Sequence, residues 1–303
     1  MQEGKLGLGK LSRGDLRDLV LRHLPVAGAG LDANLLPVGG DRLVITVNPA
    51  LGVPVETLGF FAFHYAAGNV AAAMARPRFA ALAILTPPGF PKRELETIAK
   101  AFGKEARDYG VTVVAGHTGA YKGLTLPVAV TTVVGERERT PRRPSVGDAV
   151  VVAGPVAAEA VWLLSLAGKA EVPAGFWRSL TPLPLALKLA KLDGVKLMHD
   201  VSEGGLLAAL WDIAETYGVA LSVSSADVPL AEGARELGVD PLMAPSYGAL
   251  VVICSPDMAA RVTKACGPSS AVIGRVTGGY GVFVDGKVRE ARRTWIDELY
   301  GEL

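Results

Sequence analysis

The sequence predicts a two-domain α/β protein, and three observations support this. The 303 residues are 50% hydrophobic and only 20% charged, which is enough for two domains that each bury a core. Apolar runs of strand character alternate with segments of helical period along the whole chain. Residues 135–145 interrupt this alternation with charges and two prolines, as a linker does. We therefore expect an N-terminal domain over residues 1–140 and a C-terminal α/β sandwich over residues 145–303.

The N-terminal half is predicted to hold three helices and four strands. Ser12 suits the N-cap of the first helix. The second helix is apolar on nearly all sides, so we expect it to be buried. The third begins at Pro91 and ends at Gly110. The predicted helices are 12–23, 56–75 and 91–110, and the predicted strands are 43–47, 80–85, 111–115 and 126–134.

The C-terminal half is predicted to alternate strands with helices and to end in a hairpin. Asp285-Gly286 is a preferred pair for a two-residue hairpin turn, here within residues 281–289. The predicted strands are 149–153, 195–198, 219–224, 248–255 and 271–277, and the predicted helices are 157–166, 183–192, 204–217 and 257–266.

Composition excludes several classes of protein. The net charge of +1 predicts no nucleic-acid or membrane-surface role, which would need a surplus of basic residues. No apolar run is long enough for a membrane span, and residues 1–5 lack the apolar core of a signal peptide, so we expect a cytoplasmic protein. The two cysteines, Cys254 and Cys266, are no secreted disulfide framework, although a bridge between them stays open. Asn and Gln are scarce, which is typical of a thermophilic source.

A glycine-rich segment near the N-terminus resembles a phosphate-binding P-loop but does not satisfy its requirements. Residues 4–10 fit the first seven positions, whereas Leu11 stands where Ser or Thr would hold magnesium. Only three residues precede Gly4, so no strand can lead into the loop. We reject a P-loop. Lys10 remains a candidate contact for a phosphate, and the alternative is an ordinary solvated lysine.

The most informative segment is the run His199-Asp200-Val201-Ser202-Glu203-Gly204-Gly205-Leu206. It leaves a predicted strand and opens a predicted helix. Asp200 or Ser202 can cap that helix, and Gly204 and Gly205 let its free amide groups face a ligand. A helix N-terminus of this kind favours an anion. The alternative is an ordinary capped turn between strand and helix, which the residues taken alone favour.

Four polar residues stand at or beside the ends of predicted elements: Asp32, Asn48, Asn69 and His117. Together they can contact a phosphate or a cation, although amides and a histidine are poor ligands for magnesium. Taken singly, Asn48 before a proline reads as a turn residue, Asn69 as a hydrogen-bonded helix residue and His117 as a loop residue. His64 lies on the apolar helix and is expected to be a hydrogen-bonded core histidine.

The segment from His199 to Leu206 resembles the HDVSxGGL signature of formylglycinamidine ribonucleotide synthase and the HDATRGG segment of the HypE hydrogenase-maturation family. Both belong to the AIR synthase superfamily, with selenophosphate synthetase and thiamine-monophosphate kinase. Further segments resemble the superfamily in the same order, so the resemblance covers nearly the whole chain. These segments are 30–33, 46–48, 68–77, 116–118, 238–242 and 273–276.

The resemblance implies an AIR synthase-like two-domain fold in a homodimer, with the N-terminal domains pairing into a β-barrel. It implies ATP in a groove along that interface, Mg²⁺ held by Asp residues, and activation of an amide-type or similar small substrate by phosphorylation. It also suggests other maturation proteins as partners. The implied ATP or phosphate contacts are Lys10, Asp32, Asn48, Asn69, His117, Thr118, His199, Asp200, Ser202, Gly204 and Gly205, with Asp32 as the metal ligand.

The sequence departs from the superfamily at chemically important positions. Asn48, Val70 and His117 replace three carboxylates, so we expect Mg²⁺ to contribute less than in relatives. Tyr247 stands where HypE has Glu, and the chain ends without the cysteine that carries the reacting group in HypE. Catalytic residues are therefore not assigned. Two hypotheses remain, an ATP-dependent enzyme and a non-catalytic HypE-like paralogue that acts as a nucleotide-binding partner or regulator. A purine-pathway enzyme is a weaker third.

Overall fold

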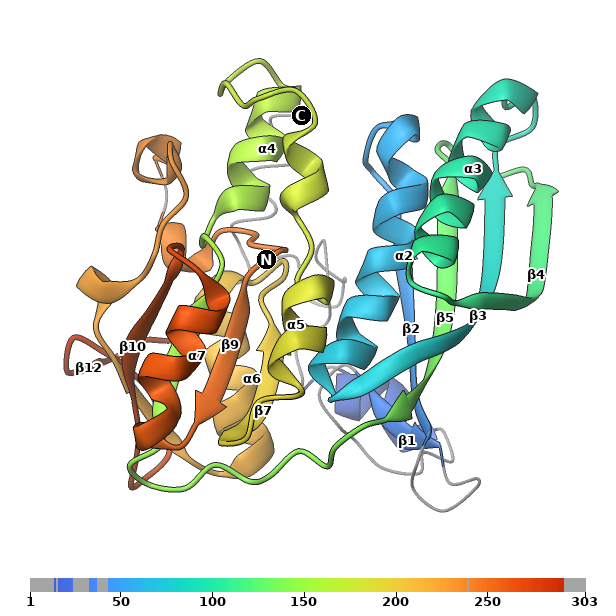
Figure 1. The fold of residues 1–303 in the computed structure, drawn as a ribbon. Coiled ribbons are helices and arrows are strands. Elements are labelled where there is room, and N and C mark those ends of the chain that lie inside the picture. Colours follow the sequence, from blue (N-terminus) through green and yellow to red (C-terminus); the bar gives the residue numbers. More distant parts are fainter. Residues whose placement is uncertain (1–13, 15, 24–32, 37–42, 239, 292–303) are drawn as a thin grey trace. The chain divides into compact units, whose positions relative to one another are not determined.

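The structure is a computed structural model that describes residues 14, 16–23, 33–36, 43–238 and 240–291 (Figure 1). Its contacts divide the chain into two compact units. We call Asp32–Arg142 with Thr181–Met198 the N-terminal unit, and Arg143–Leu180 with the chain from His199 onward the C-terminal unit. Each combines strands and helices, which confirms the predicted α/β class. Residues 181–198 thus pack with the N-terminal unit although they follow the predicted linker.

The N-terminal unit contains a five-stranded sheet in the order β1-β2-β5-β3-β4. One face of this sheet is covered by α2, which has almost no polar side and is buried over most of its length. By contrast, α3 buries a single stripe that includes Ile98 and Phe102, as an amphipathic helix does. The elements are β1 Asn34–Leu36, β2 Leu43–Ala50, α2 Val55–Ala72, β3 Ala75–Thr86, α3 Lys92–Asp108, β4 Thr112–Ala120, β5 Val128–Arg137 and α5 Leu183–Leu189.

All four predicted strands of this sheet extend beyond their predicted ends, and in β2 and β4 the extension includes a predicted site residue. β2 continues through Asn48 and Pro49, so the prediction of a turn at Asn48 is wrong. The described part of β1 pairs with β2 only as far as Ile45, and beyond it Pro49 pairs with β5 on one side, an edge-like position where proline is tolerated. β4 runs parallel to β3 as far as Ala120 and includes His117, so the prediction of a loop there is also wrong.

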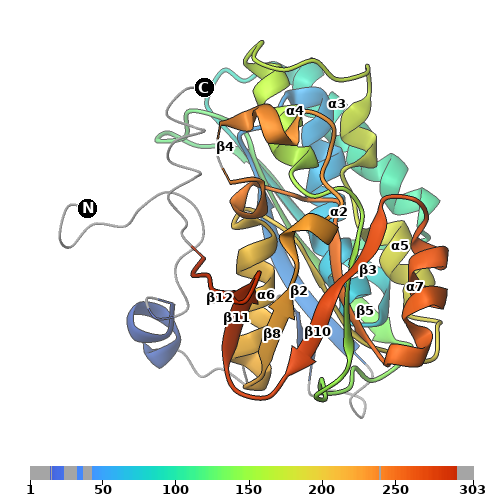
Figure 2. The same ribbon diagram turned by 90° about the vertical axis from the view of Figure 1, so that its left-hand side faces the viewer.

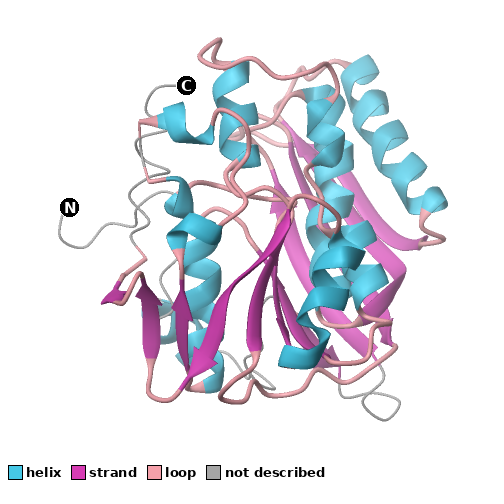
Figure 3. Cartoon of the chain, turned by 60° about the vertical axis from the view of Figure 1, so that its left-hand side comes forward, coloured by secondary structure: helices cyan, strands magenta, loops and turns pink. Residues whose placement is uncertain are grey.

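The C-terminal unit is built on a seven-stranded sheet in the order β12-β11-β8-β10-β6-β9-β7, and the division between the units falls within its edge strand β7, after Met198. Every residue of β6 and β9 is buried, as their unbroken apolar sequences predict. The strands are β6 Ala149–Ala153, β7 Val195–Asp200, β8 Ala220–Val223, β9 Leu250–Cys254, β10 Ser270–Thr277, β11 Gly281–Val284 and β12 Lys287–Val288. The longer helices are α4 Ala158–Leu166, α6 Gly205–Tyr217 and α7 Ala259–Cys266 (Figure 2). Figure 3 shows helices and strands alternating through the chain.

Short helical turns complete the described chain. They are η1 Leu16–Val20, η2 Leu21–His23, η3 Phe176–Ser179, η4 Ser225–Asp227, η5 Ala234–Leu237, η6 Pro241–Met243 and η7 Pro256–Met258. The predicted first helix therefore appears as η1 and η2, whereas Ser12 lies outside the described residues. None of the helices in the described ranges is long and apolar enough to cross a membrane.

Local chemistry predicted the final hairpin and the position of both cysteines. Asp285 and Gly286 have φ of 51° and 78°, as a two-residue hairpin turn requires, and they join β11 to β12. Cys254 is buried in β9 and Cys266 ends α7, and the two form no disulfide with each other, so the open possibility of a bridge is not realised.

Candidate functional site

Asn48 and Asn69 form a polar cluster between β2 and α2. The Asn69 Nδ2 donates to the Asn48 Oδ1 at 3.1 Å, and the Thr46 hydroxyl donates to the same oxygen at 3.2 Å. Asn69 and Thr46 are only 4% and 5% exposed. The prediction of Asn69 as a hydrogen-bonded helix residue is confirmed. The three side chains that make these hydrogen bonds carry no formal charge, so they offer a metal cation no carboxylate.

Two threonines of this region were not singled out from the sequence. Thr131 lies opposite Asn48 on β5, and its buried hydroxyl has no hydrogen-bond partner among the described residues. Thr46 lies two residues before Asn48, and alternate residues of a strand share a face. This two-residue alternation along the strand could have identified Thr46 from the sequence. Thr131 could not be identified, because it depends on the pairing of β2 with β5.

His117 and Thr118 lie on β4, apart from this cluster. The pairing places Asn48 in a row with Thr131, Leu82 and Gly116, and places His117 in the next row, three strands from β2. Three strand spacings amount to about 14 Å, and adjacent rows point to opposite faces. The His117 Nε2 instead lies 2.5 Å from the Tyr121 hydroxyl, and both residues are exposed.

Within the N-terminal unit, the sheet thus keeps His117 and Thr118 apart from Asn48 and Asn69. Lys10 and Asp32 lie outside the described residues, so their place in a site stays a prediction. Within the described ranges, no group of three or more His, Cys, Asp or Glu side chains is arranged to hold a metal ion. The amides and the imidazole do not fit Mg²⁺, which prefers carboxylates and water.

The first half of the segment from His199 to Leu206 is anchored inside the C-terminal unit. His199 and Asp200 end β7 and are 4% and 5% exposed. The His199 Nε2 lies 3.3 Å from the Asp212 Oδ2, and its Nδ1 lies 3.7 Å from the Asp200 Oδ1. Asp212 is seven residues after Gly205 on α6, which places it two turns along the same side of the helix. The sequence analysis missed Asp212, although this spacing is a signal for it.

The second half of the segment begins α6 without a side-chain cap. Gly204 occupies the N-cap, and no side chain accepts a hydrogen bond there. The prediction that Asp200 or Ser202 caps the helix is wrong, because Asp200 is held in β7 and Ser202 accepts from the Gly205 amide through its backbone carbonyl, at 2.9 Å. The positive end of the helix dipole is thus not offset by a capping side chain, a setting that favours an anion.

Gly205 is required by packing as well as by conformation. Its φ is +66°, and a Cβ built there would lie 2.5 Å from the Met243 carbonyl carbon and 2.6 Å from the Leu242 oxygen. The segment therefore packs directly on η6, whose N-cap Asp240 accepts a hydrogen bond from the Leu242 amide at 3.0 Å. Residues 199–206 and residues 238–242, which both resemble the superfamily in sequence, are therefore neighbours in the fold.

Tyr247, at the position of the HypE glutamate, is buried and contacts a carboxylate from elsewhere in the chain. Its backbone N–H donates to the Glu159 Oε2 of α4 at 2.9 Å. Glu159 is 8% exposed. Nothing in the sequence pointed to Glu159, because 88 residues separate the two partners.

His64 is a core histidine, as predicted. It is 1% exposed, its Nε2 lies 3.1 Å from the Glu105 Oε2, and its Nδ1 lies 2.7 Å from the Thr181 hydroxyl. Burial lowers the pKa of His64 below its ordinary value, against the opposing effect of Glu105. The hydrogen bond from His64 lowers the pKa of Glu105. The pair is therefore a neutral imidazole beside an ionised carboxylate at neutral pH.

Comparisons with known proteins agree with this architecture. The C-terminal domain model of AIR synthase related protein matches residues 145–287, and the N-terminal domain model matches residues 30–136. The carbamoyl dehydratase HypE of Bradyrhizobium diazoefficiens is 29% identical over 255 residues, 78% of this chain and 73% of that protein.

Two solved structures extend the similarity to the fold. The hydrogenase maturation protein HypE in complex with ATP has a TM-score of 0.73 and 25% identity, covering 94% of this chain and 95% of that one. A HypE–HypF complex contains a chain with a TM-score of 0.76 and 21% identity, covering 86% and 93%. The two domain models together match most of the sequence, and the chain belongs to the AIR synthase related protein family.

Proposed function

We propose that this protein binds ATP and uses it to activate an amide-type or similar small substrate. The observation that carries the proposal is the start of α6, where Gly204 and Gly205 leave the first helical turn without a side-chain cap. The similar HypE chain crystallised with ATP supports it. The amide groups of this turn would donate to phosphate oxygens, and the buried His199 and Asp200 with the half-buried Asp212 hold the turn in place.

Further predicted nucleotide contacts belong to the N-terminal unit. Asn48, Asn69, His117 and Thr118 would offer the nucleotide amides, an imidazole and a hydroxyl, and Lys10 and Asp32 are also predicted contacts. This set is poor in carboxylates and does not fit Mg²⁺. Phosphoryl transfer normally relies on metal ions to neutralise developing charge, so this protein should transfer phosphate slowly.

A second function is a non-catalytic one, in which the protein binds nucleotide as a partner or regulator. Asn48, which accepts a hydrogen bond from Asn69, favours it, since Asn48 stands where the superfamily places a carboxylate. The existence of a HypE–HypF complex makes other maturation proteins candidate partners, and the cytoplasm is the compartment proposed for both functions. ATP hydrolysis measured with and without candidate amide substrates separates the two. Turnover supports the enzyme, and tight binding without turnover supports the regulator.

ATP binding is expected to be weak and nearly independent of magnesium. Amides approach phosphate without the repulsion that metal ions relieve between carboxylates and phosphate. Isothermal calorimetry with ATP, with and without Mg²⁺, measures this directly. Asn48→Asp and His117→Asp, made singly and together, should raise the magnesium dependence several-fold. Tight binding by the natural protein only with Mg²⁺, together with ordinary hydrolysis, would refute the argument from missing carboxylates.

The protein is expected to form a homodimer through the sheet face opposite α2. Val47 and Phe79 belong to rows that alternate with those facing α2, and they are 61% and 47% exposed. Apolar side chains exposed on a sheet favour association with a second apolar surface. Val47→Lys with Phe79→Lys should shift micromolar protein from dimer to monomer in sedimentation. Val146→Lys, at an exposed valine of the C-terminal unit, is the control. A monomeric natural protein contradicts the proposal.

A further inference from the structure

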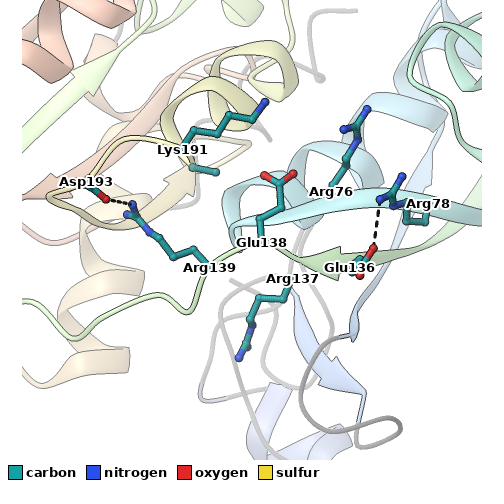
Figure 4. Close-up of a pocket in the computed structure, with 9 residues that line it drawn as sticks. Arg76, Arg78, Glu136, Arg137, Glu138, Arg139, Lys191 and Asp193 are labelled. Atoms are coloured by element: carbon teal, nitrogen blue, oxygen red, sulfur yellow. Dashed lines mark hydrogen bonds and ion pairs between the residues drawn. The ribbon is translucent and has the colours of Figure 1, made fainter.

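We propose that a groove in the N-terminal unit binds a phosphate group of a small molecule, separately from the Asn48 part of the proposed nucleotide site. The groove has a volume of about 490 Å³ and lies where β3 begins, where β5 ends and where the chain leaves α5 (Figure 4). Five cationic and three acidic side chains line it, which leaves a net charge of +2. This size is within the range of small-molecule sites.

Two of the acidic residues are already next to arginines. Glu136 is opposite Arg76 in the pairing of β3 with β5, yet its carboxylate accepts from the Arg78 Nη2 at 3.2 Å. Arg139 donates from Nη1 to the Leu192 carbonyl at 2.7 Å and lies 3.7 Å from Asp193. Arg78 and Arg139 are thus engaged in holding this part of the fold.

Three cations remain without an ion pair in the part of the chain that the structure describes: Arg76, Arg137 and Lys191. In Figure 4, Arg76 and Lys191 extend to the same side of β5 as Glu138, and Glu138 lies between them. Arg137 extends to the other side, with its Nε buried and without a hydrogen-bond partner among the described residues. We infer that Arg76 and Lys191 hold the anion, while Arg137 adds a more distant positive charge.

A phosphate monoester fits these groups. It carries close to two negative charges at neutral pH, which matches the net charge of the groove. A guanidinium can donate two parallel hydrogen bonds to it, and an ammonium adds a compact charge from the opposite side. Glu138 repels such an anion, so its exposed side chain must turn away when phosphate enters. Glu138 therefore sets the affinity of the site.

The groove is distant from Asn48, a proposed nucleotide contact in the same unit. Glu136 pairs with Leu43 at the start of β2, whereas Asn48 lies five residues further along the same strand. Five residues of extended chain span about 17 Å. Phosphate bound by Arg76 and Lys191 would therefore not occupy the place of a nucleotide phosphate at Asn48.

Calorimetric titration of the full chain with inorganic phosphate, at constant ionic strength and with saturating ATP, tests the proposal. Arg76→Gln and Lys191→Gln should each weaken phosphate binding about fivefold to tenfold, since each removes a charged hydrogen bond. Glu138→Gln should strengthen it about threefold by removing the repulsion. Arg93→Gln, at an exposed position of α3, neutralises a charge outside the groove and should have no effect.

Arg76→Gln and Lys191→Gln should weaken phosphate binding, whereas Glu138→Gln should strengthen it. These opposite effects distinguish a specific site from a general attraction of anions to the protein. If Arg93→Gln weakens binding as much as Arg76→Gln, only the overall charge matters and the proposal is wrong. It is also wrong if Glu138→Gln leaves the affinity unchanged, or if saturating ATP abolishes phosphate binding. Phosphate binding that persists when ATP binding itself proves absent would support the groove while removing the proposed function.

Discussion

Gly59→Ala is expected to lower the free energy of unfolding by about 3 kcal/mol, the largest effect among single-residue changes considered for this protein. Gly59 lies on α2 where α3 crosses it most closely. A Cβ there would lie 2.1 Å from the Ile98 carbonyl oxygen and 2.7 Å from the Phe102 amide nitrogen. These are backbone atoms of α3, so they cannot move aside as a side chain would. The two helices would have to separate along a buried interface.

Gly103→Ala is the matched control, on α3 itself. A Cβ at this position meets only the Arg107 guanidinium, at 3.3 Å, which is the mobile end of a flexible side chain. Alanine favours a helix interior over glycine, so this change should raise stability by about 0.5–1 kcal/mol. Urea unfolding of both variants measures the difference. Equal effects of the two substitutions would show that close helix contact at Gly59 does not determine stability.

His64→Phe is expected to lower the free energy of unfolding by about 2 kcal/mol at pH 7, and also to reduce its dependence on pH. The change leaves the Glu105 carboxylate and the Thr181 hydroxyl without their shared partner in the core. Phenylalanine keeps an aromatic ring among Phe60, Phe63 and Tyr109, which pack around His64. The lost stability can therefore be assigned to hydrogen bonding more than to volume.

The pH dependence has a definite sign. Because the pKa of His64 is lowered on folding, the unfolded chain binds more protons below the ordinary value of 6.5, and stability falls as the pH decreases. The lowered pKa of Glu105 acts in the same direction below 4.5. Chemical unfolding between pH 7.5 and 5 should show this decline in the natural protein and a flatter profile in His64→Phe. The exposed His23→Gln should retain the decline, and a flattened profile in that variant would point to another group.

Much of the fold was predictable because its signals are local. The apolar α2, the amphipathic α3 and the hairpin at Asp285-Gly286 each follow from residues within one element. The ends of β2 and β4 were not predictable, because pairing with β5 and β3 keeps Asn48 and His117 in extended conformation. Local propensity then gives way to hydrogen bonds with distant strands.

The candidate site was less predictable for the same reason. Residue types near Gly204 and Gly205 indicated a helix start suited to an anion, and the structure has that helix start. The sequence could not show that Asp200 is held in the strand, that the half-buried carboxylate of Asp212 contacts His199, or that the buried carboxylate of Glu159 accepts from Tyr247. These partners are far apart in the sequence and meet only in the folded chain. His199 and Asp212 are separated by 13 residues, and Tyr247 and Glu159 by 88 residues.

The place of residues 181–198 affects how the protein can be divided. Thr181 bonds to His64, and α5 packs against α2, although the N-terminal family model ends at residue 136. A recombinant fragment cut after the linker would omit α5 and uncover an apolar flank of α2. Such a fragment would aggregate during expression, whereas a permuted gene that fuses residues 181–194, which include α5, directly behind residue 142 would keep this flank covered. The N-terminal family model is therefore shorter than the unit in which its residues pack.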